Sequence, residues 1–200
     1  MTLKYLALGD SYTIGEAVAE NENFPNQLVN KMSFQNIEFE TPLIIAQTGW
    51  TTGELMEAIK EMNIVEKFNL ATLLIGVNNQ YRQASLDEYE KQFELLLQQA
   101  IGFADHKPNH VIVLSIPDWA VTPFASDSNQ NKISAEIDAF NEINKKITQK
   151  HQAHYLDITP GTRLAKTDNS LLASDSLHPS ALEYSRWVSM IQPIVSDLYA

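Results

Sequence analysis

Short apolar runs alternate with longer segments of helical periodicity along the whole chain, and this alternation restricts the fold more than any other feature. The apolar runs lie at residues 3–8, 41–46, 70–75, 111–116 and 154–158. Runs of this length and hydrophobicity are typical of strands that are covered on both faces. Strands separated by helices form parallel βαβ units with right-handed crossovers. The sequence therefore predicts one α/β domain over residues 1–200, with three α/β/α layers around a five-stranded parallel sheet.

Capping signals and apolar spacing mark the helices between these runs. Thr51 and Ser85 each stand three residues before a glutamate, the spacing of a capping box. Apolar side chains then recur at steps of three and four in three segments, which are Leu86-Tyr89-Phe93-Leu96-Ala100-Ala104, Ile133-Ile137-Phe140-Ile143-Ile147 and Tyr184-Val188-Ile191-Val195-Leu198. Pro179 suits the first turn of the last helix, and Pro193 predicts a kink or an interruption within it.

Charge and cysteine content exclude several classes of function. The chain has 14 basic and 25 acidic side chains and a net charge of −11, without a Lys/Arg cluster, which argues against a nucleic-acid partner. The absence of cysteine excludes disulfides, thiolate metal sites and a cysteine nucleophile. Met1 leads almost directly into the first predicted strand, and no apolar run approaches the ~20 residues of a membrane span. We therefore expect a cytoplasmic protein without a membrane span, although a chain trimmed of its export signal would look the same.

Four short segments follow the predicted strands and contain small or polar residues. They are Gly9-Asp10-Ser11, Gly49, Gly76-Val77-Asn78 and Pro117-Asp118. In an open parallel sheet, ligands bind beyond the carboxyl ends of the strands, where the strand order reverses. We therefore expect these segments to converge at one edge of the sheet.

Ser11, His178 and Asp175 supply the parts of a nucleophilic site. Ser11 stands at the tip of a strand, and Asp175 lies three residues before His178. A serine, a base and a carboxylate that orients the base make a weak hydroxyl able to attack an ester. Each also has a simpler interpretation, with Ser11 as a helix cap, Asp175 as a turn residue and His178 as a cap. Asp157, at the end of the last predicted strand, is the alternative orienting carboxylate.

The positions of the other histidines favour His178 as the base, and the spacing around Ser11 limits the type of hydrolase. His106, His110, His151 and His154 fall in polar connections or near a helix end, and we expect them at the surface or in loops. Gly15 is four residues after Ser11, so the G-x-S-x-G elbow of the common α/β-hydrolases is absent.

Two further residues could stabilise the oxyanion that forms when an ester carbonyl is attacked. Gly49 can present a backbone N–H with no side chain in the way, and Asn78 can offer its side-chain amide. The simpler interpretations are a glycine in a strand-to-helix turn and an asparagine that forms a turn.

Together these segments resemble, in order, the four sequence blocks of the SGNH hydrolases, also called GDSL esterases/lipases. The blocks are Gly9-Asp10-Ser11-Tyr12-Thr13-x-Gly15, Gly49, Gly76-Val77-Asn78-Asn79 and Asp175-x-x-His178. The resemblance implies a flavodoxin-like sheet with strand order 2-1-3-4-5, and acyl-ester hydrolysis without metal or cofactor. It also implies roles for individual residues: Ser11 as nucleophile, His178 as base, Asp175 as its orienter, and the Ser11 N–H, Gly49 N–H and Asn78 amide as the oxyanion hole.

This chain departs from the family pattern at two positions. Tyr12 replaces the usual leucine, a largely apolar exchange. Asn79 replaces the usual aspartate, and because that position is not one of the catalytic four, we expect altered local hydrogen bonding rather than lost activity.

Several alternatives remain for function and substrate. Trp119 and Phe124, in an irregular stretch after the fourth strand, could line an acyl or leaving-group pocket or cover the core beneath a loop. The small-molecule ester could be an acetyl ester or a lysophospholipid, and the same site could serve acyl transfer, thioesters or peptides. The segment from Ser11 to Gly15 also resembles a hydroxyl-rich FMN phosphate loop, and a flavodoxin-like module would be recognised by its flavin colour.

Overall fold

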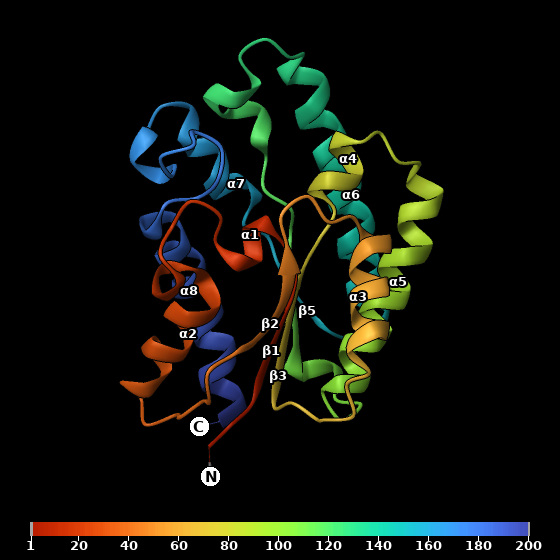
Figure 1. Cartoon of the computed structure of the whole chain (residues 1–200), viewed down its shortest axis with the longest axis vertical. Helices are drawn as coiled ribbons and strands as arrows, with labels where there is room; N and C mark the ends of the chain where they lie inside the picture. Colours follow the sequence, from red (N-terminus) through yellow and green to blue (C-terminus); the bar gives the residue numbers. More distant parts are fainter. Residues whose placement is uncertain (1, 200) are drawn as a thin grey trace.

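The computed structural model describes residues 2–199 and contains a parallel sheet with strand order β2-β1-β3-β4-β5 (Figure 1). The strands are β1 (Tyr5–Asp10), β2 (Leu43–Gln47), β3 (Leu70–Leu74), β4 (Val111–Leu114) and β5 (His154–Leu156). Every residue of β1, β3 and β4 is buried, as expected for strands covered on both faces. The expected five-stranded parallel sheet and its order are confirmed.

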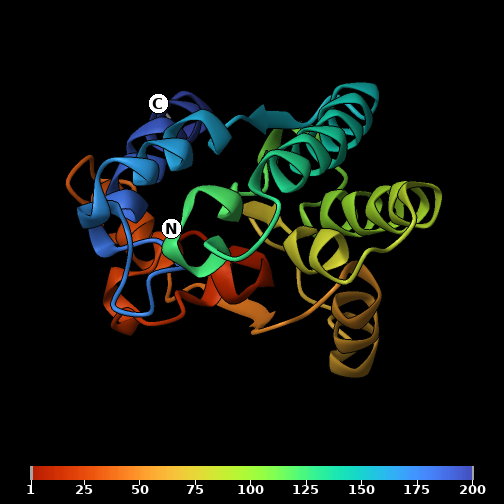
Figure 2. The same ribbon diagram turned by 90° about the horizontal axis from the view of Figure 1, so that it is seen from above.

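Helices cover both faces of the sheet and complete the three layers (Figures 1 and 2). Helices α2 (Phe24–Ser33) and α8 (Ala181–Tyr199) pack together on one face. The opposite face is covered by α3 (Thr52–Met62), α5 (Leu86–Phe103) and α6 (Gln130–Lys150). Both termini lie at the amino ends of the strands, opposite α1 (Figure 1).

Short helices lie in the connections between the strands and the long helices, most of them near the carboxyl ends of the strands. The α-helical ones are α1 (Ser11–Ile14), α4 (Val77–Tyr81) and α7 (Thr159–Thr162). The 3₁₀ helices are η1 (Glu20–Glu22), η2 (Pro108–His110), η3 (Trp119–Val121), η4 (Pro123–Ala125), η5 (Arg163–Lys166) and η6 (Asn169–Leu171). Seen from above, the green segment that contains η3 and η4 crosses the carboxyl end of the sheet between the two helical layers (Figure 2).

The strand register brings three loops to one level. Asp10 at the end of β1 pairs with Gln47 of β2, and Gly9 pairs with Leu74 of β3. The loops after β1, β2 and β3 therefore leave the sheet side by side. This is the point where the strand order reverses, and the expected convergence of these segments is present.

Two details differ from the sequence-based expectations. Of the kink or interruption expected at Pro193, no interruption is present, because α8 continues through this residue with Ile191 and Val195 on either side fully buried. Pro179 lies outside this helix, in a β-bridge with Leu172. His154 is the first residue of β5, as the apolar run at 154–158 predicts, and not a loop residue.

Gly76, which ends the β3 connection and caps α4, cannot be replaced without strain. Its φ is +133°, and a Cβ there would lie 2.4 Å from the hydroxyl oxygen of the fully buried Tyr89. We expect Gly76→Ala to lower the free energy of unfolding by about 2–4 kcal/mol, because backbone strain and overpacking add. Chemical denaturation measures this change.

Gly102 provides the matched control, because it lies in α5 and no atom comes within 4 Å of an added Cβ. Gly102→Ala should leave stability unchanged or raise it by up to about 1 kcal/mol. Equal stability of the two variants would contradict the proposed crowding at Gly76.

Candidate active site

Ser11 is held at the junction of β1 and α1. It is the first residue of the helix, and Asp10 caps that helix by accepting the Tyr12 N–H at 3.0 Å. A Cβ on Gly9 would lie 2.1 Å from Thr13 Oγ1, so only glycine lets α1 approach β1 this closely. The junction therefore fixes the Ser11 hydroxyl at the carboxyl end of β1.

Asp175 and His178 form a compact local structure that is held by the Asp175 carboxylate. Asp175 Oδ1 accepts the backbone N–H groups of Leu177 at 3.0 Å and His178 at 2.9 Å. Asp175 Oδ2 lies 2.6 Å from His178 Nδ1. His178 Nε2 lies 2.9 Å from Ser11 Oγ, so the three side chains form one continuous line of contacts.

The environment of this line favours an ionised Asp175 and a fixed imidazole. Burial raises the pKa of the Asp175 carboxyl, but hydrogen bonds from the His178 side chain and from the backbone N–H groups of His178 and Leu177 outweigh it, so the net pKa is lowered. The Tyr12 ring lies against the imidazole, with 4.9 Å between ring centroids. The replacement of leucine by Tyr12 therefore keeps an apolar wall beside the histidine.

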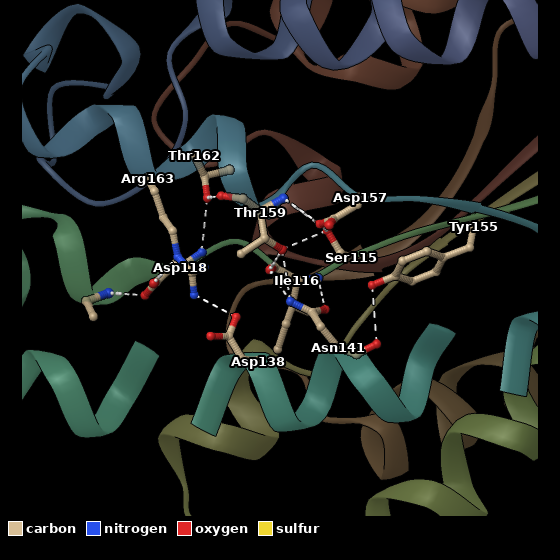
Figure 3. Close-up of polar contacts among 11 residues, drawn as sticks. Ser115, Ile116, Asp118, Asp138, Asn141, Tyr155, Asp157, Thr159, Thr162 and Arg163 are labelled. Carbon is tan, nitrogen blue, oxygen red and sulfur yellow. Dashed lines mark hydrogen bonds and ion pairs between the residues drawn. The ribbon is translucent and has the colours of Figure 1, made fainter. Parts of the chain in front are cut away.

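Asp157 and the other histidines lie in different contacts. Asp157 accepts the Ser115 hydroxyl at 3.1 Å and the Thr159 N–H at 3.3 Å, within a polar cluster near the end of β4 (Figure 3). His151 pairs with Glu94, His110 contacts the Asn69 carbonyl, and His106 is exposed. The structure therefore brings Asp175, not Asp157, to His178.

Gly49 occupies a β-turn after β2. The Trp50 N–H donates to the Gln47 carbonyl at 3.2 Å, and Gly49 has a φ of +86°. A positive φ at the third position defines a type II turn, which requires glycine there. The Gly49 N–H belongs to the central peptide of this turn, so the turn type decides the direction in which that N–H points.

Asn78 connects this turn to α4. Its Nδ2 donates to the Trp50 carbonyl at 3.0 Å and lies 3.5 Å from Asp10 Oδ2. Its side chain also lines the cleft that contains Ser11 and His178. The Ser11 N–H is a third donor beside the Gly49 N–H and the Asn78 amide, because the first N–H of a helix has no acceptor within that helix.

Asn79 uses the donor that an aspartate would lack. Its Oδ1 accepts the Thr52 N–H at 3.0 Å, and its Nδ2 donates to Thr52 Oγ1 at 2.8 Å, so that the Thr52 hydroxyl is left to donate to Gln92. An ionised aspartate accepts only and would need the hydroxyl as its donor. Asn79 therefore ties α4 to the start of α3.

An open cleft of about 170 Å³ lies beside Ser11. It is lined by Ser11, Tyr12, Thr48, Val77, Asn78, Tyr81, Trp119, Phe124, Leu177 and His178. Both Trp119 and Phe124 line this cleft, and Trp119 is also buried. Thr48, Tyr81 and Leu177 had no sequence signal beyond standing next to the recognised blocks.

The aromatic wall of this cleft is anchored from two sides. The Trp119 ring meets Tyr81 and Phe124 edge-on, with centroids 5.5 and 6.0 Å away, and its Nε1–H donates to Gln80 at 2.7 Å. The preceding Asp118 is fully buried and pairs with Arg163 at 2.8 Å.

Arg163 also pairs with Asp138 of α6 at 2.7 Å (Figure 3). The start of η3 is thereby tied to both η5 and α6, which holds the wall in one position.

The described part of the chain, residues 2–199, contains neither a metal-binding cluster nor a membrane-spanning helix. Over this range no group of three or more His, Cys, Asp or Glu side chains is arranged to hold a metal ion. No helix in the same range is both long enough and apolar enough to cross a membrane.

Comparison with known proteins places the chain among acyl hydrolases. The sequence pattern of the GDSL-like Lipase/Acylhydrolase family matches residues 7–186. A spore germination lipase, LipC, from Bacillus licheniformis is 34% identical over 95 residues, which cover 46% of this chain and 44% of that protein. The match thus spans less than half the length of this curated relative.

Solved structures share the whole fold at low sequence identity. The acetylxylan esterase Axe2 from Geobacillus stearothermophilus has a TM-score of 0.75 and 18% identity, covering 96% of this chain and 94% of its own. The esterase EstA from Pseudoalteromonas sp. has a TM-score of 0.71 and 15% identity, covering 96% and 98%. Likeness at this identity establishes a common fold.

Asp10 is buried directly beside Ser11, and burial raises the pKa of its carboxyl from 3.8 to about 7. Between these two values the native state holds a proton that the unfolded state has released, so stability falls as pH rises. Asp10→Asn keeps an acceptor for the Tyr12 N–H but removes the titration. We expect the stability of the variant relative to wild type to rise by up to about 1.4 kcal/mol per pH unit in this window.

Urea denaturation at several pH values between 4 and 8 measures this difference. Asp197 lies near the end of α8. The variant Asp197→Asn is the control, because it removes a carboxylate other than the buried one. Parallel pH profiles of wild type and Asp10→Asn would contradict the prediction.

Proposed function

Since the chain belongs to the GDSL-like lipase/acylhydrolase family, we propose that it hydrolyses carboxylic acyl esters with Ser11 as nucleophile, His178 as base and Asp175 as orienter. The observation that carries the proposal is the continuous line of contacts from Ser11 Oγ to His178 Nε2 and from His178 Nδ1 to Asp175. Family membership supplies the class of reaction, and this line supplies the residues.

In the first half of the reaction, Ser11 Oγ forms a bond to the acyl carbon and its proton passes to His178 Nε2. The carbonyl becomes a tetrahedral oxyanion, which then collapses, breaks the bond to the alcohol oxygen and returns the carbonyl. His178 gives its proton to the departing alcohol. Asp175 stays ionised throughout and stabilises the imidazolium, in agreement with its lowered pKa.

In the second half, water replaces the alcohol. His178 takes a proton from the water, whose oxygen attacks the acyl carbon, and the second tetrahedral intermediate expels Ser11 Oγ. The proton returns to Ser11, and the carboxylic acid leaves. We assign stabilisation of both oxyanions to the Ser11 N–H, the Gly49 N–H and the Asn78 amide, because preorganised donors are worth several kcal/mol in such sites.

The lining of the cleft supports esters that are uncharged near the scissile bond. The ten lining residues include no Lys, Arg, Asp or Glu, and three of them form the aromatic wall. The relatives named above include a lipase and an acetylxylan esterase. A panel from acetyl to long-chain esters, with acetylated sugars, lysophospholipids and thioesters, defines the substrate, and analysis of the products with an acceptor alcohol present separates hydrolysis from acyl transfer.

Replacing the nucleophile tests the proposal directly. Ser11→Ala removes only the attacking oxygen, so turnover should fall by about three orders of magnitude or more while the unfolding transition stays in place. A serine-directed phosphonate should add covalently to wild type and not to the variant, as measured by intact-protein mass spectrometry. Labelling of Ser11→Ala at the wild-type rate would mean that another residue is the nucleophile.

Two isosteric variants separate the candidate carboxylates. Asp175→Asn should lower kcat by roughly 10³–10⁴, with KM nearly unchanged, because the amide favours the wrong His178 tautomer. Asp157→Asn, the matched control, should alter stability or nothing, since Asp157 contacts Ser115 and Thr159. The opposite ranking would assign the orienting role to Asp157.

The aromatic wall should set the preferred length of the substrate. Trp119→Ala and Phe124→Ala each widen the cleft, so we expect kcat/KM for longer acyl or alcohol groups to rise relative to acetyl esters. Phe124 is half-exposed and its loss should hardly affect stability, whereas buried Trp119 should cost about 3–5 kcal/mol. An unchanged chain-length preference in both variants would remove these residues from the substrate pocket.

A further inference from the structure

Helix α4 holds the turn that contains Gly49 through a set of hydrogen bonds that the proposed mechanism does not use. Asn78 donates to the Trp50 carbonyl at 3.0 Å. Arg82, the C-cap of the same helix, donates through Nη2 to the Gly49 carbonyl at 2.6 Å. One short helix thus holds two successive carbonyls of the turn.

Glu54 fixes the Arg82 side chain from the other side. Arg82 Nη1 lies 3.1 Å from Glu54 Oε1 and 3.2 Å from Glu54 Oε2. Glu54 is itself held at the start of α3, where its Oε2 accepts the Thr51 N–H at 2.7 Å and the Thr51 hydroxyl at 2.9 Å. These contacts make the guanidinium a fixed strut between α3, α4 and the turn.

The Gly49 N–H needs such support because its direction depends on the turn type. Rotation of the central peptide converts a type II turn into a type I turn and points that N–H to the opposite side. Glycine tolerates both conformations, so the residue itself does not select one. The direction of the Gly49 N–H is therefore set by the contacts that hold the two carbonyls after the central peptide, those of Gly49 and Trp50.

We propose that Arg82, clamped by Glu54, is a positioning residue that orients the Gly49 N–H toward the oxyanion. The inference rests on the proposed function, since it assigns Gly49 to the oxyanion hole. Arg82 is not among the residues that line the cleft, so it acts through the turn and not by binding substrate. Its side chain is half-exposed, so solvent screens its charge and the geometry of the contact accounts for its effect.

The test compares kinetics of Arg82→Met with those of wild type, using the ester on which wild type is most active. Loss of one oriented oxyanion donor should lower kcat by about 10- to 100-fold while KM stays within about twofold. Arg186→Met is the matched control, because Arg186 is also partly exposed and paired with a glutamate, Glu183, on α8. That control should keep wild-type kcat.

Two further measurements separate positioning from a general loss of structure. Methylguanidine at millimolar concentration should restore part of the kcat that Arg82→Ala loses. It should not change the kcat of the control Arg186→Met. Glu54→Gln, which keeps a side chain able to contact Thr51 but loses the ion pair, should show a smaller fall in kcat than Arg82→Met. Unfolding transitions of all variants should lie close to that of wild type.

The outcomes distinguish this proposal from the proposed function. If wild type is active and Arg82→Met is equally active, or differs from wild type only in KM, the positioning role of Arg82 is overturned. The proposed ester hydrolysis would be unaffected by that result. A fall in kcat without rescue and with a matching loss of stability would also overturn it. A wild type inactive on every ester, and unlabelled by the phosphonate, would overturn both.

Discussion

The candidate site depends on the hydrogen-bonded register of the three strands β2, β1 and β3. Because parallel pairing aligns Asp10 with Gln47 and Gly9 with Leu74, the chain leaves all three strands at the same level. The nucleophile candidate and all three proposed oxyanion donors follow within four residues of these ends. A shift of one residue in either pairing would turn the strand residues to the opposite face and separate these groups.

Crowding at this edge explains why the loops contain glycine and why short polar side chains surround them. Three strands, α1 and α4 meet within a few ångströms, so an added Cβ at Gly9 or Gly76 would collide with Thr13 or Tyr89. The same closeness lets one side chain hold several segments. Asp10 both caps α1 and reaches Asn78, which is why its carboxylate is fully buried beside the serine.

Polar contacts hold the walls of the cleft in addition to the hydrophobic packing of Tyr12, Val77 and Trp119 in the core. Both carboxylate oxygens of the buried Asp118 have partners, because Arg163 pairs with one and the Ala120 N–H donates to the other. The indole of Trp119 is likewise satisfied by Gln80.

The sequence by itself determined the strand and helix pattern and the pairing of Asp175 with His178, because apolar period and contacts over three residues are local properties. Only the tertiary structure decided which residues line the cleft, that Asp175 and not Asp157 contacts His178, and that Arg82 holds the Gly49 carbonyl. Ser11 and His178 are 167 residues apart, and their contact exists only once the sheet has aligned the strand ends. Pro193 shows the same limit, since burial of its neighbours outweighs its local tendency to break a helix.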